Sequence, residues 1–211
     1  GLNSGLMAKD MRIISGILKG RQIRFPADIR PTQNKVRKAV FDCLAQAVEG
    51  AEFLELFAGS GAVGIEAISC GAKRVTFVDN DFNSLKAIES NLKELDLDER
   101  HYRIVRSDAF KFLDDWAGKK TGFDIIFSDP PYRQFLAKNC LLRISACDIL
   151  NPSGILVIEH HKKEELPQVV GNGRDRSLLL FKQKSYGDKI LSFYEEDRLK
   201  NVPEGNLSRV I

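Results

Sequence analysis

The sequence predicts an α/β protein with a mostly parallel, seven-stranded sheet, an antiparallel hairpin at its C-terminal end and a small N-terminal β-hairpin extension. Three observations support this prediction. From Glu52 onward, short apolar runs alternate with amphipathic helical stretches, which is typical of a parallel sheet covered on both faces. Residues 177–196 read as two strands around a tight turn. The length of 211 residues suits one such domain with a short extension.

The first segment, residues 11–31, is predicted to be a basic hairpin because apolar and basic residues alternate between glycine turns. Nine Lys and Arg side chains occur between positions 9 and 38, against only Asp10 and Asp28. This local excess of positive charge is a candidate footprint for nucleic acid. A solvated charged surface is the alternative.

The remaining elements follow in order along a domain assigned to residues 32–198. A helix over residues 31–48 is expected to begin at Pro31 and Thr32, residue types that suit a helix start. Strands are expected at 52–57, 73–79, 102–108, 123–129 and 154–160, and helices at 58–71, 83–95, 109–117 and 135–150. Residues 1–10, with a native start at Met7 or Met11, are expected to be disordered or tag-derived, and residues 199–211 a loose tail.

We expect a cytoplasmic protein that binds no metal, and we expect a monomer although no sequence feature determines the oligomeric state. The four cysteines form no C-x-x-C pair, so we expect reduced thiols. No apolar run reaches membrane-spanning length. His160 and His161 lack further ligands at metal-binding spacing, and we interpret His160 as a rim residue near the substrate entrance and His161 as ordinary surface.

A glycine-rich loop follows the first strand of the domain. The stretch LELFAGSGAVG places Gly59, Gly61 and Gly64 in G-x-G-x-x-G spacing between a strand and a helix. Glycine permits a tight turn and a close approach of the backbone to a ligand. The motif alone is a weak signal, because a strand-to-helix turn can require glycine for its own geometry. No G-K-[ST] follows, so the loop is not a phosphate-binding P-loop.

Two acids follow the next two strands. Asp79 can accept hydrogen bonds from a ribose diol, and Asp108 can accept one from an adenine amino group while Phe110 packs on the adenine. The carboxyl ends of parallel strands meet at one edge of a sheet, where ligands of such folds bind. A single acid at a strand end is more often a helix cap. Successive strand ends carrying a glycine loop and several acids favour a binding site.

The stretch FSDPPY, residues 127–132, ends the fourth strand. An exocyclic amine of a nucleobase is a weak nucleophile because its lone pair is delocalised into the ring. Asp129 and the carbonyl of Pro130 can accept hydrogen bonds from its two N–H groups, and Pro131 helps to fix the turn. Tyr132 can stack on a base taken out of its helix or loop. Such a site aligns an amine with a methyl group on a sulfonium. A Pro-Pro turn without chemistry is the alternative, and whether Asp129 also removes a proton stays open.

Together these motifs resemble the S-adenosylmethionine-dependent methyltransferases that modify amino groups. The stretches RIISGILKGRQI, IRPTQNKVRKAVFDCL and LELFAGSGAVGIEAISCGAKRVTFVD resemble, in this order, the RsmD family of small-subunit ribosomal RNA guanine-N2 methyltransferases. The resemblance covers nearly all of residues 11–197, and R-P-T-x-x-x-V-R is its most discriminating part. It implies a Rossmann-like class I methyltransferase fold, S-adenosylmethionine as cofactor, and one guanosine of 16S ribosomal RNA in the small subunit as substrate.

The resemblance also implies roles for individual residues. The family often has Glu in place of Asp79 and Phe in place of Tyr132, which agrees with diol binding and with stacking. The implied catalytic residues are Asp129, Pro130, Pro131 and Tyr132. The implied cofactor-binding residues are Phe57, Ala58, Gly59, Ser60, Gly61, Gly64, Asp79, Asn80, Asp108, Ala109 and Phe110. Arg12, Lys19, Arg21 and Arg24 suit phosphate contacts, while Arg30, Thr32 and Arg37 would close over the cofactor or touch RNA.

Two other functions are compatible with the motifs. One is a different amino methyltransferase, acting on adenine N6 or on glutamine, although the small size and lack of a target-recognition domain argue against a sequence-specific DNA enzyme. The other is a non-catalytic RNA-binding or assembly protein that retains the fold. The intact glycine loop, both cofactor acids and D-P-P-Y argue against loss of chemistry.

Overall fold

The computed structural model describes residues 9–26, 28, 32–132, 135–172 and 176–197. Arg30 and Pro31, and the predicted tail at 199–211, lie outside the described residues. No helix in these ranges is long and apolar enough to cross a membrane.

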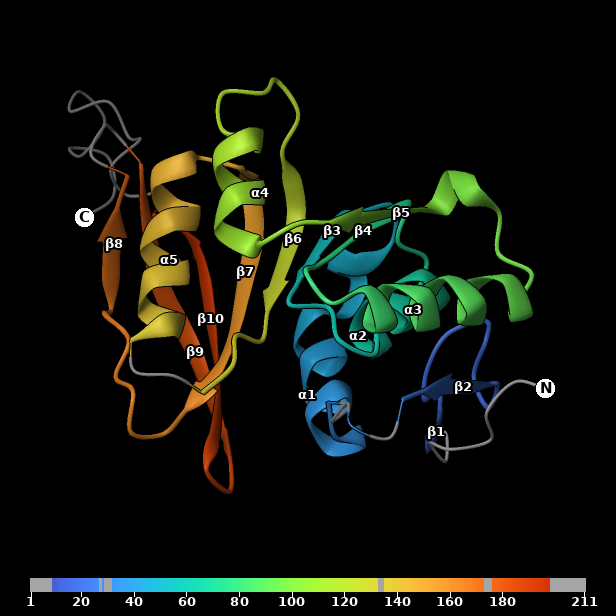
Figure 1. The fold of residues 1–211 in the computed structure, drawn as a ribbon. Helices are drawn as coiled ribbons and strands as arrows, with labels where there is room; N and C mark the ends of the chain where they lie inside the picture. The colour runs from blue at the N-terminus through green and yellow to red at the C-terminus, as the bar shows by residue number, and fades with distance from the viewer. Residues whose placement is uncertain (1–8, 27, 29–31, 133–134, 173–175, 198–211) are drawn as a thin grey trace.

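A single large sheet forms the centre of the domain and confirms the predicted fold class (Figure 1). Its order is β5-β4-β3-β6-β7-β10-β9-β8, in which β5 to β7 run parallel and the C-terminal strands antiparallel. The strands are β3 (Glu52–Leu56), β4 (Arg74–Asp79), β5 (Tyr102–Arg106), β6 (Phe123–Ser128), β7 (Leu150–His161), β8 (Val169–Gly171), β9 (Ser177–Tyr186) and β10 (Lys189–Glu196).

Helices cover both faces of this sheet, as its apolar strands require. One core lies between the sheet and α1 to α3, and it includes Val40, Ile65, Ile88 and Phe127. The other lies between the sheet and α4 and α5, and it includes Ile158. The helices are α1 (Asn34–Leu44), α2 (Ala62–Ser69), α3 (Phe82–Glu94), α4 (Ala109–Trp116) and α5 (Leu136–Cys147), with short 3₁₀ turns η1 (Ala45–Val48) and η2 (Glu99–His101).

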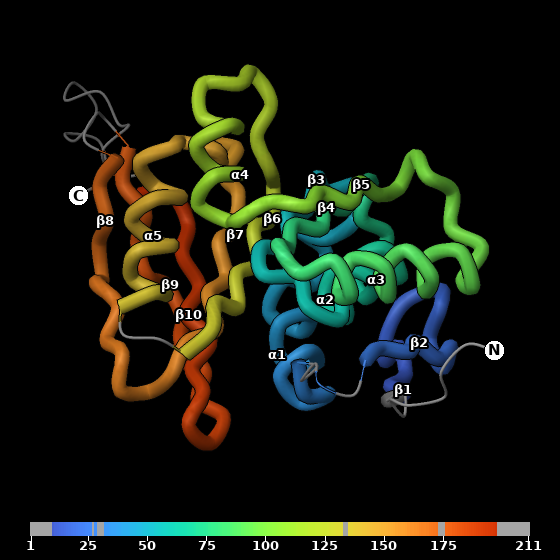
Figure 2. Tube along the Cα trace, in the orientation of Figure 1, coloured from blue at the N-terminus to red at the C-terminus, as the bar shows by residue number. Residues whose placement is uncertain are grey.

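The N-terminal extension is an antiparallel hairpin of β1 (Lys9–Arg12) and β2 (Gln22–Phe25). Figures 1 and 2 show it packed beside α3, at the opposite end of the molecule from β8. The hairpin begins two residues before the predicted boundary. Ile23 is fully buried, so the extension shares the core of the domain.

The structure differs from the sequence-based elements in three main places. The helix predicted over 31–48 is the shorter α1, which ends at Leu44 because Ala45 has a positive φ of 42°, and η1 follows. Strand β8 adds an eighth strand, which the sequence did not reveal because only three residues pair. The predicted helix at 135–150 ends at Cys147, and Leu150 already belongs to β7. Asp148 adopts the left-handed conformation (φ 53°) that ends the helix, so the apolar pair after it enters the sheet.

Candidate active site

The glycine loop lies between β3 and α2, at the carboxyl edge of the sheet. Phe57, Gly59 and Gly61 have positive φ angles of 57°, 52° and 68°, so the chain makes a tight left-handed turn. At Gly64 a Cβ atom would lie only 2.3 Å from the Phe77 ring. Gly59 and Gly61 therefore make the tight turn that was predicted, and Gly64 permits close packing of α2 against β4, which the sequence analysis did not consider. Ala58 and Ser60 of the same loop are buried.

Asp79 ends β4 beside this loop and holds it in place. Its Oδ2 accepts a hydrogen bond from the Gly59 amide at 2.8 Å, and its Oδ1 accepts one from the Asp81 amide at 2.9 Å. Asp79 is half-buried and Asn80 exposed, so this part of the edge is open to a ligand. A ribose diol could share the same carboxylate, since each of its oxygens has a second lone pair.

Asp108 has the helix-capping role that the sequence left as an alternative. Its Oδ1 accepts hydrogen bonds from the amides of Phe110 and Lys111, at 2.9 and 3.0 Å, at the start of α4. Asp108 is exposed, Ala109 buried and Phe110 half-buried. Because the cap uses Oδ1, the second oxygen is the one through which Asp108 can accept a hydrogen bond from adenine.

Asp129 follows β6 and stands next to an acid that the sequence analysis missed. Ser128 pairs with Ile158 on β7, so Asp129 is side by side with Glu159 and on the same face of the sheet. Glu159 is fully buried and forms an ion pair with Lys189, at the start of β10. Glu159 also accepts a hydrogen bond from the Tyr132 hydroxyl at 3.1 Å. A hydrogen bond therefore joins the D-P-P-Y turn to β7, and the ion pair continues this contact to β10.

This cluster changes the acidity of its members. Burial, and then the nearby Glu159 carboxylate, raise the pKa of Asp129 to about 8, although Lys189 opposes the shift. Burial also raises the pKa of Tyr132 to about 12, which keeps its hydroxyl protonated. Tyr132 is 51% exposed, and its ring meets His161 edge-on at 5.8 Å between centroids. It is thus accessible for stacking on a base.

His160 is not the rim residue that we expected. Its side chain is 1% exposed, and its Nε2 lies 2.7 Å from the Ser192 hydroxyl. Side chains alternate along β7, so His160 shares the face of Ile158, beneath the layer of α4 and α5, while His161 shares the face of Glu159. Among the described residues, no three His, Cys, Asp or Glu side chains gather as a metal site would require.

Four of the predicted phosphate contacts lie on the hairpin and its loop. Arg12, Lys19, Arg21 and Arg24 are all exposed. The Arg21 guanidinium donates to the Glu94 carbonyl at the end of α3, at 3.0 Å. Thr32, which precedes α1, is buried. Exposure of these four cations is compatible with phosphate contacts, which stay a prediction.

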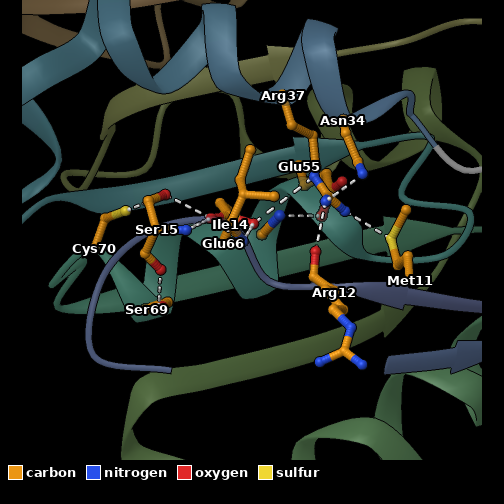
Figure 3. Close-up of polar contacts among 11 residues, drawn as sticks. Met11, Arg12, Ile14, Ser15, Asn34, Arg37, Glu55, Glu66, Ser69 and Cys70 are labelled. Atoms are coloured by element: carbon orange, nitrogen blue, oxygen red, sulfur yellow. Dashed lines mark hydrogen bonds and ion pairs between the residues drawn. The ribbon is translucent and has the colours of Figure 1, made fainter. Parts of the chain in front are cut away.

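Arg37 is a correction to the predicted RNA and cofactor contacts. It is fully buried, and its guanidinium lies 3.7 Å from the Glu66 carboxylate of α2 (Figure 3). It also donates to the Arg12 carbonyl at 2.8 Å and to Asn34 at 2.9 Å. The sequence suggested a surface cation because arginines are rarely buried without a partner. The partner, Glu66, is 29 positions away in sequence, so the sequence did not reveal it. Arg37 therefore joins the hairpin to the helix that follows the glycine loop.

Comparisons with known proteins identify relatives along nearly the whole chain. A family model described as "Conserved hypothetical protein 95" matches residues 11–195. The Bacillus subtilis (strain 168) protein YlbH, provisionally named as an rRNA methyltransferase, is 38% identical over 88% of this chain and 99% of its own. Ribosomal RNA small subunit methyltransferase D of Escherichia coli (strain K12) is 31% identical over 89% of this chain and 90% of its own. A solved structure of the Escherichia coli protein yhhF, provisionally named as a methyltransferase, superimposes with a TM-score of 0.76 at 31% identity, covering 90% of this chain and 99% of that one.

Proposed function

Because the chain belongs to the RsmD family, we propose that it transfers a methyl group from S-adenosylmethionine to the N2 amine of one guanosine in 16S ribosomal RNA. The observation that carries this proposal is the arrangement at the carboxyl edge of the sheet. There the glycine loop follows β3 beside Asp79, and the D-P-P-Y turn follows β6, the neighbour of β3 on its other side.

The cofactor side of the site is made by backbone and carboxylate groups. The turn at residues 57–61 brings the chain close to the methionine and ribose, Asp79 accepts hydrogen bonds from the diol, and Asp108 with the start of α4 faces the adenine. When bound, the cofactor supplies a methyl group on a positively charged sulfur. The protein then has to present an amine in line with that methyl group.

The substrate side orients the amine. Ionised Asp129 and the Pro130 carbonyl accept hydrogen bonds from its two N–H groups, so that the nitrogen lone pair points at the methyl group. Tyr132 stacks on the base after it leaves its neighbours in the RNA. The exposed cations of the hairpin, 12, 19, 21 and 24, contact phosphates around the target.

Methyl transfer to ribosomal subunits tests the proposal. Small subunits from cells that lack the native methylation are incubated with the enzyme and S-adenosylmethionine labelled in its methyl group, and the RNA is then digested to nucleosides. We expect label in N2-methylguanosine. Sequencing of labelled RNA fragments that are protected from nuclease then locates the methylated nucleotide. Label in N6-methyladenosine would keep the chemistry and reject the base. Binding of RNA without any label would favour a non-catalytic assembly protein.

The raised pKa of Asp129 predicts a pH dependence. An acid with a raised pKa holds its proton at neutral pH, and the ionised carboxylate is the stronger acceptor for the amine hydrogen bond that Asp129 receives. We therefore expect kcat/KM to rise with pH and to level off above about 8. Glu55 has a pKa raised to about 8 by burial as well, so the assignment needs variants. Asp129→Asn should be slow and lack this rise, whereas Glu55→Gln should keep it. A rise that persists in Asp129→Asn would assign it to another group.

The hairpin cations predict a salt dependence. In the double variant Lys19→Ala/Arg24→Ala, two exposed cations are lost without any change in the D-P-P-Y cluster. We expect weaker binding to small subunits and a salt slope of log K that is shallower by about 1.5, because each lost phosphate contact removes about 0.7–0.9. Binding measured over a series of salt concentrations gives this slope. Lys182→Met, an exposed lysine on β9, is the control, and an equal loss there would contradict a specific role for the hairpin.

A further inference from the structure

Glu159 and Lys189 form a charged pair within reach of the target base. Leu191 of β10 pairs with Glu159 of β7, so Lys189, two residues earlier, is diagonal to Glu159 on the same face. The Lys189 ammonium contacts Oε1 of Glu159, and it lies 5.6 Å from the centre of the Tyr132 ring. A base that stacks on Tyr132 therefore has its edge next to this pair and next to Asp129.

One oxygen of this pair lacks a partner. Oε2 of Glu159 is shielded from solvent and has no hydrogen bond among the residues that the structure describes, whereas Oε1 has two. A buried carboxylate oxygen without a donor is unfavourable, because its lost hydration is not replaced. The fold alone does not account for this group, since an apolar residue would suit a buried strand position better. A ligand that brings a hydrogen-bond donor would satisfy it.

Guanine and adenine present opposite patterns to such a site. On its Watson–Crick edge guanine has an acceptor at O6, then donors at N1–H and at the N2 amine. Adenine has a donor at the N6 amine and an acceptor at N1. The cluster offers a donor, Lys189, followed by two acceptors, Glu159 and Asp129, which complements guanine at all three positions. Adenine with its N6 amine at Asp129 would place its N1 lone pair against the Glu159 carboxylate and a C2–H group at the Lys189 ammonium.

We propose that Lys189 and Glu159 select guanine as the base to be methylated. Lys189 donates to O6, the unpartnered Oε2 of Glu159 accepts from N1–H, and Asp129 accepts from the N2 amine that receives the methyl group. Lys189 stays charged, because Glu159 raises its pKa against the opposing effect of burial. This inference rests on the proposed function, and it explains why an amine-methylating D-P-P-Y turn would act on guanine instead of adenine.

A purine that keeps the reactive amine but reverses the rest of the edge tests this selection. 2,6-Diaminopurine has the same N2 amine, with an amine in place of O6 and an unprotonated N1. Small subunits are reconstituted from ligated 16S ribosomal RNA with guanosine or 2,6-diaminopurine at the mapped target. We expect the wild-type enzyme to prefer guanosine by about 100-fold or more in kcat/KM, since the analogue leaves buried polar groups unpaired.

Variants of the pair should reduce this preference. The amide of Glu159→Gln can donate to an unprotonated N1, so we expect the preference for guanosine to fall below about 10-fold. Lys189→Met, which removes the repulsion of the 6-amine, should reduce the preference too, while the control Lys182→Met keeps it. The ratio of two substrates with one enzyme preparation does not depend on how much of a variant is folded.

The outcomes separate this inference from the function on which it rests. Equal rates of the wild type on both purines, or a Glu159→Gln variant that slows on both and keeps the ratio, would overturn base selection by this pair. The absence of N2-methylguanosine in wild-type reactions on guanosine would instead overturn the proposed function.

Discussion

Replacing Asp129 by alanine should lower kcat by about 10³-fold or more, since the amine loses the carboxylate that orients it toward the methyl donor. Affinity for S-adenosylmethionine should stay within a few-fold of the wild type. The cofactor side that we propose consists of the glycine loop and Asp79, and Gly59 and Asp79 contact each other without help from Asp129. Single-turnover methyl transfer and calorimetric titration of the cofactor measure the two quantities separately.

Two further variants sharpen the Asp129 experiment. Asp129→Asn keeps one acceptor oxygen, so it should retain more activity than the alanine variant. Asp115→Asn changes an exposed acid near the end of α4, and it should behave as the wild type. Loss of cofactor affinity together with turnover in Asp129→Ala would mark Asp129 as a cofactor or folding residue and contradict its proposed role.

The linear motifs of this chain were readable because each is continuous in sequence and ends a strand. Gly59, Asp79, Asp108 and Asp129 follow four apolar runs, and parallel pairing alone is enough to bring those strand ends to one edge. The seven main strands could also be predicted, because each is a continuous stretch whose apolar pattern is visible in the sequence. The sequence could therefore predict that these four motifs meet at one edge of the sheet.

The partners of these motifs depend on pairing register, which the sequence does not display. Glu159 sits inside the apolar run ILVIEH and Lys189 follows a turn 30 positions later, so neither belongs to a recognisable motif. Only the antiparallel register of β7 and β10 brings them together. His160 was wrongly predicted to lie on the rim for the same reason. Without the register, the sequence does not show which face of β7 a residue occupies, and a shift of one residue exchanges the two faces of a strand.

Arg37→Met should lower the free energy of unfolding by about 3 kcal/mol, which corresponds to a fall in Tm of roughly 6–12 °C for a domain of this size. Arg37 and Glu66 are both fully buried, so either charge without its partner is costly. Glu66 also accepts hydrogen bonds from the Ile14 and Ser15 amides, at 3.0 and 2.6 Å, which hold the hairpin against α2. Thermal unfolding followed by circular dichroism measures the change.

Companion variants identify the cause of that loss. Glu66→Gln should also destabilise the protein, and the double variant Arg37→Met/Glu66→Gln should lose less than the sum of the two single variants, because no unpaired charge remains buried. Lys38→Met, which removes an exposed ion pair with Asp42 on the same helix, should leave Tm unchanged. If Arg37→Met instead kept the wild-type Tm and lost affinity for ribosomal RNA, Arg37 would be the RNA contact that its sequence motif suggests. The expected result makes that motif the anchor of the hairpin that we propose to bind RNA. One buried cation would fix the hairpin to α2, the helix after the glycine loop, and leave the exposed cations available for phosphate.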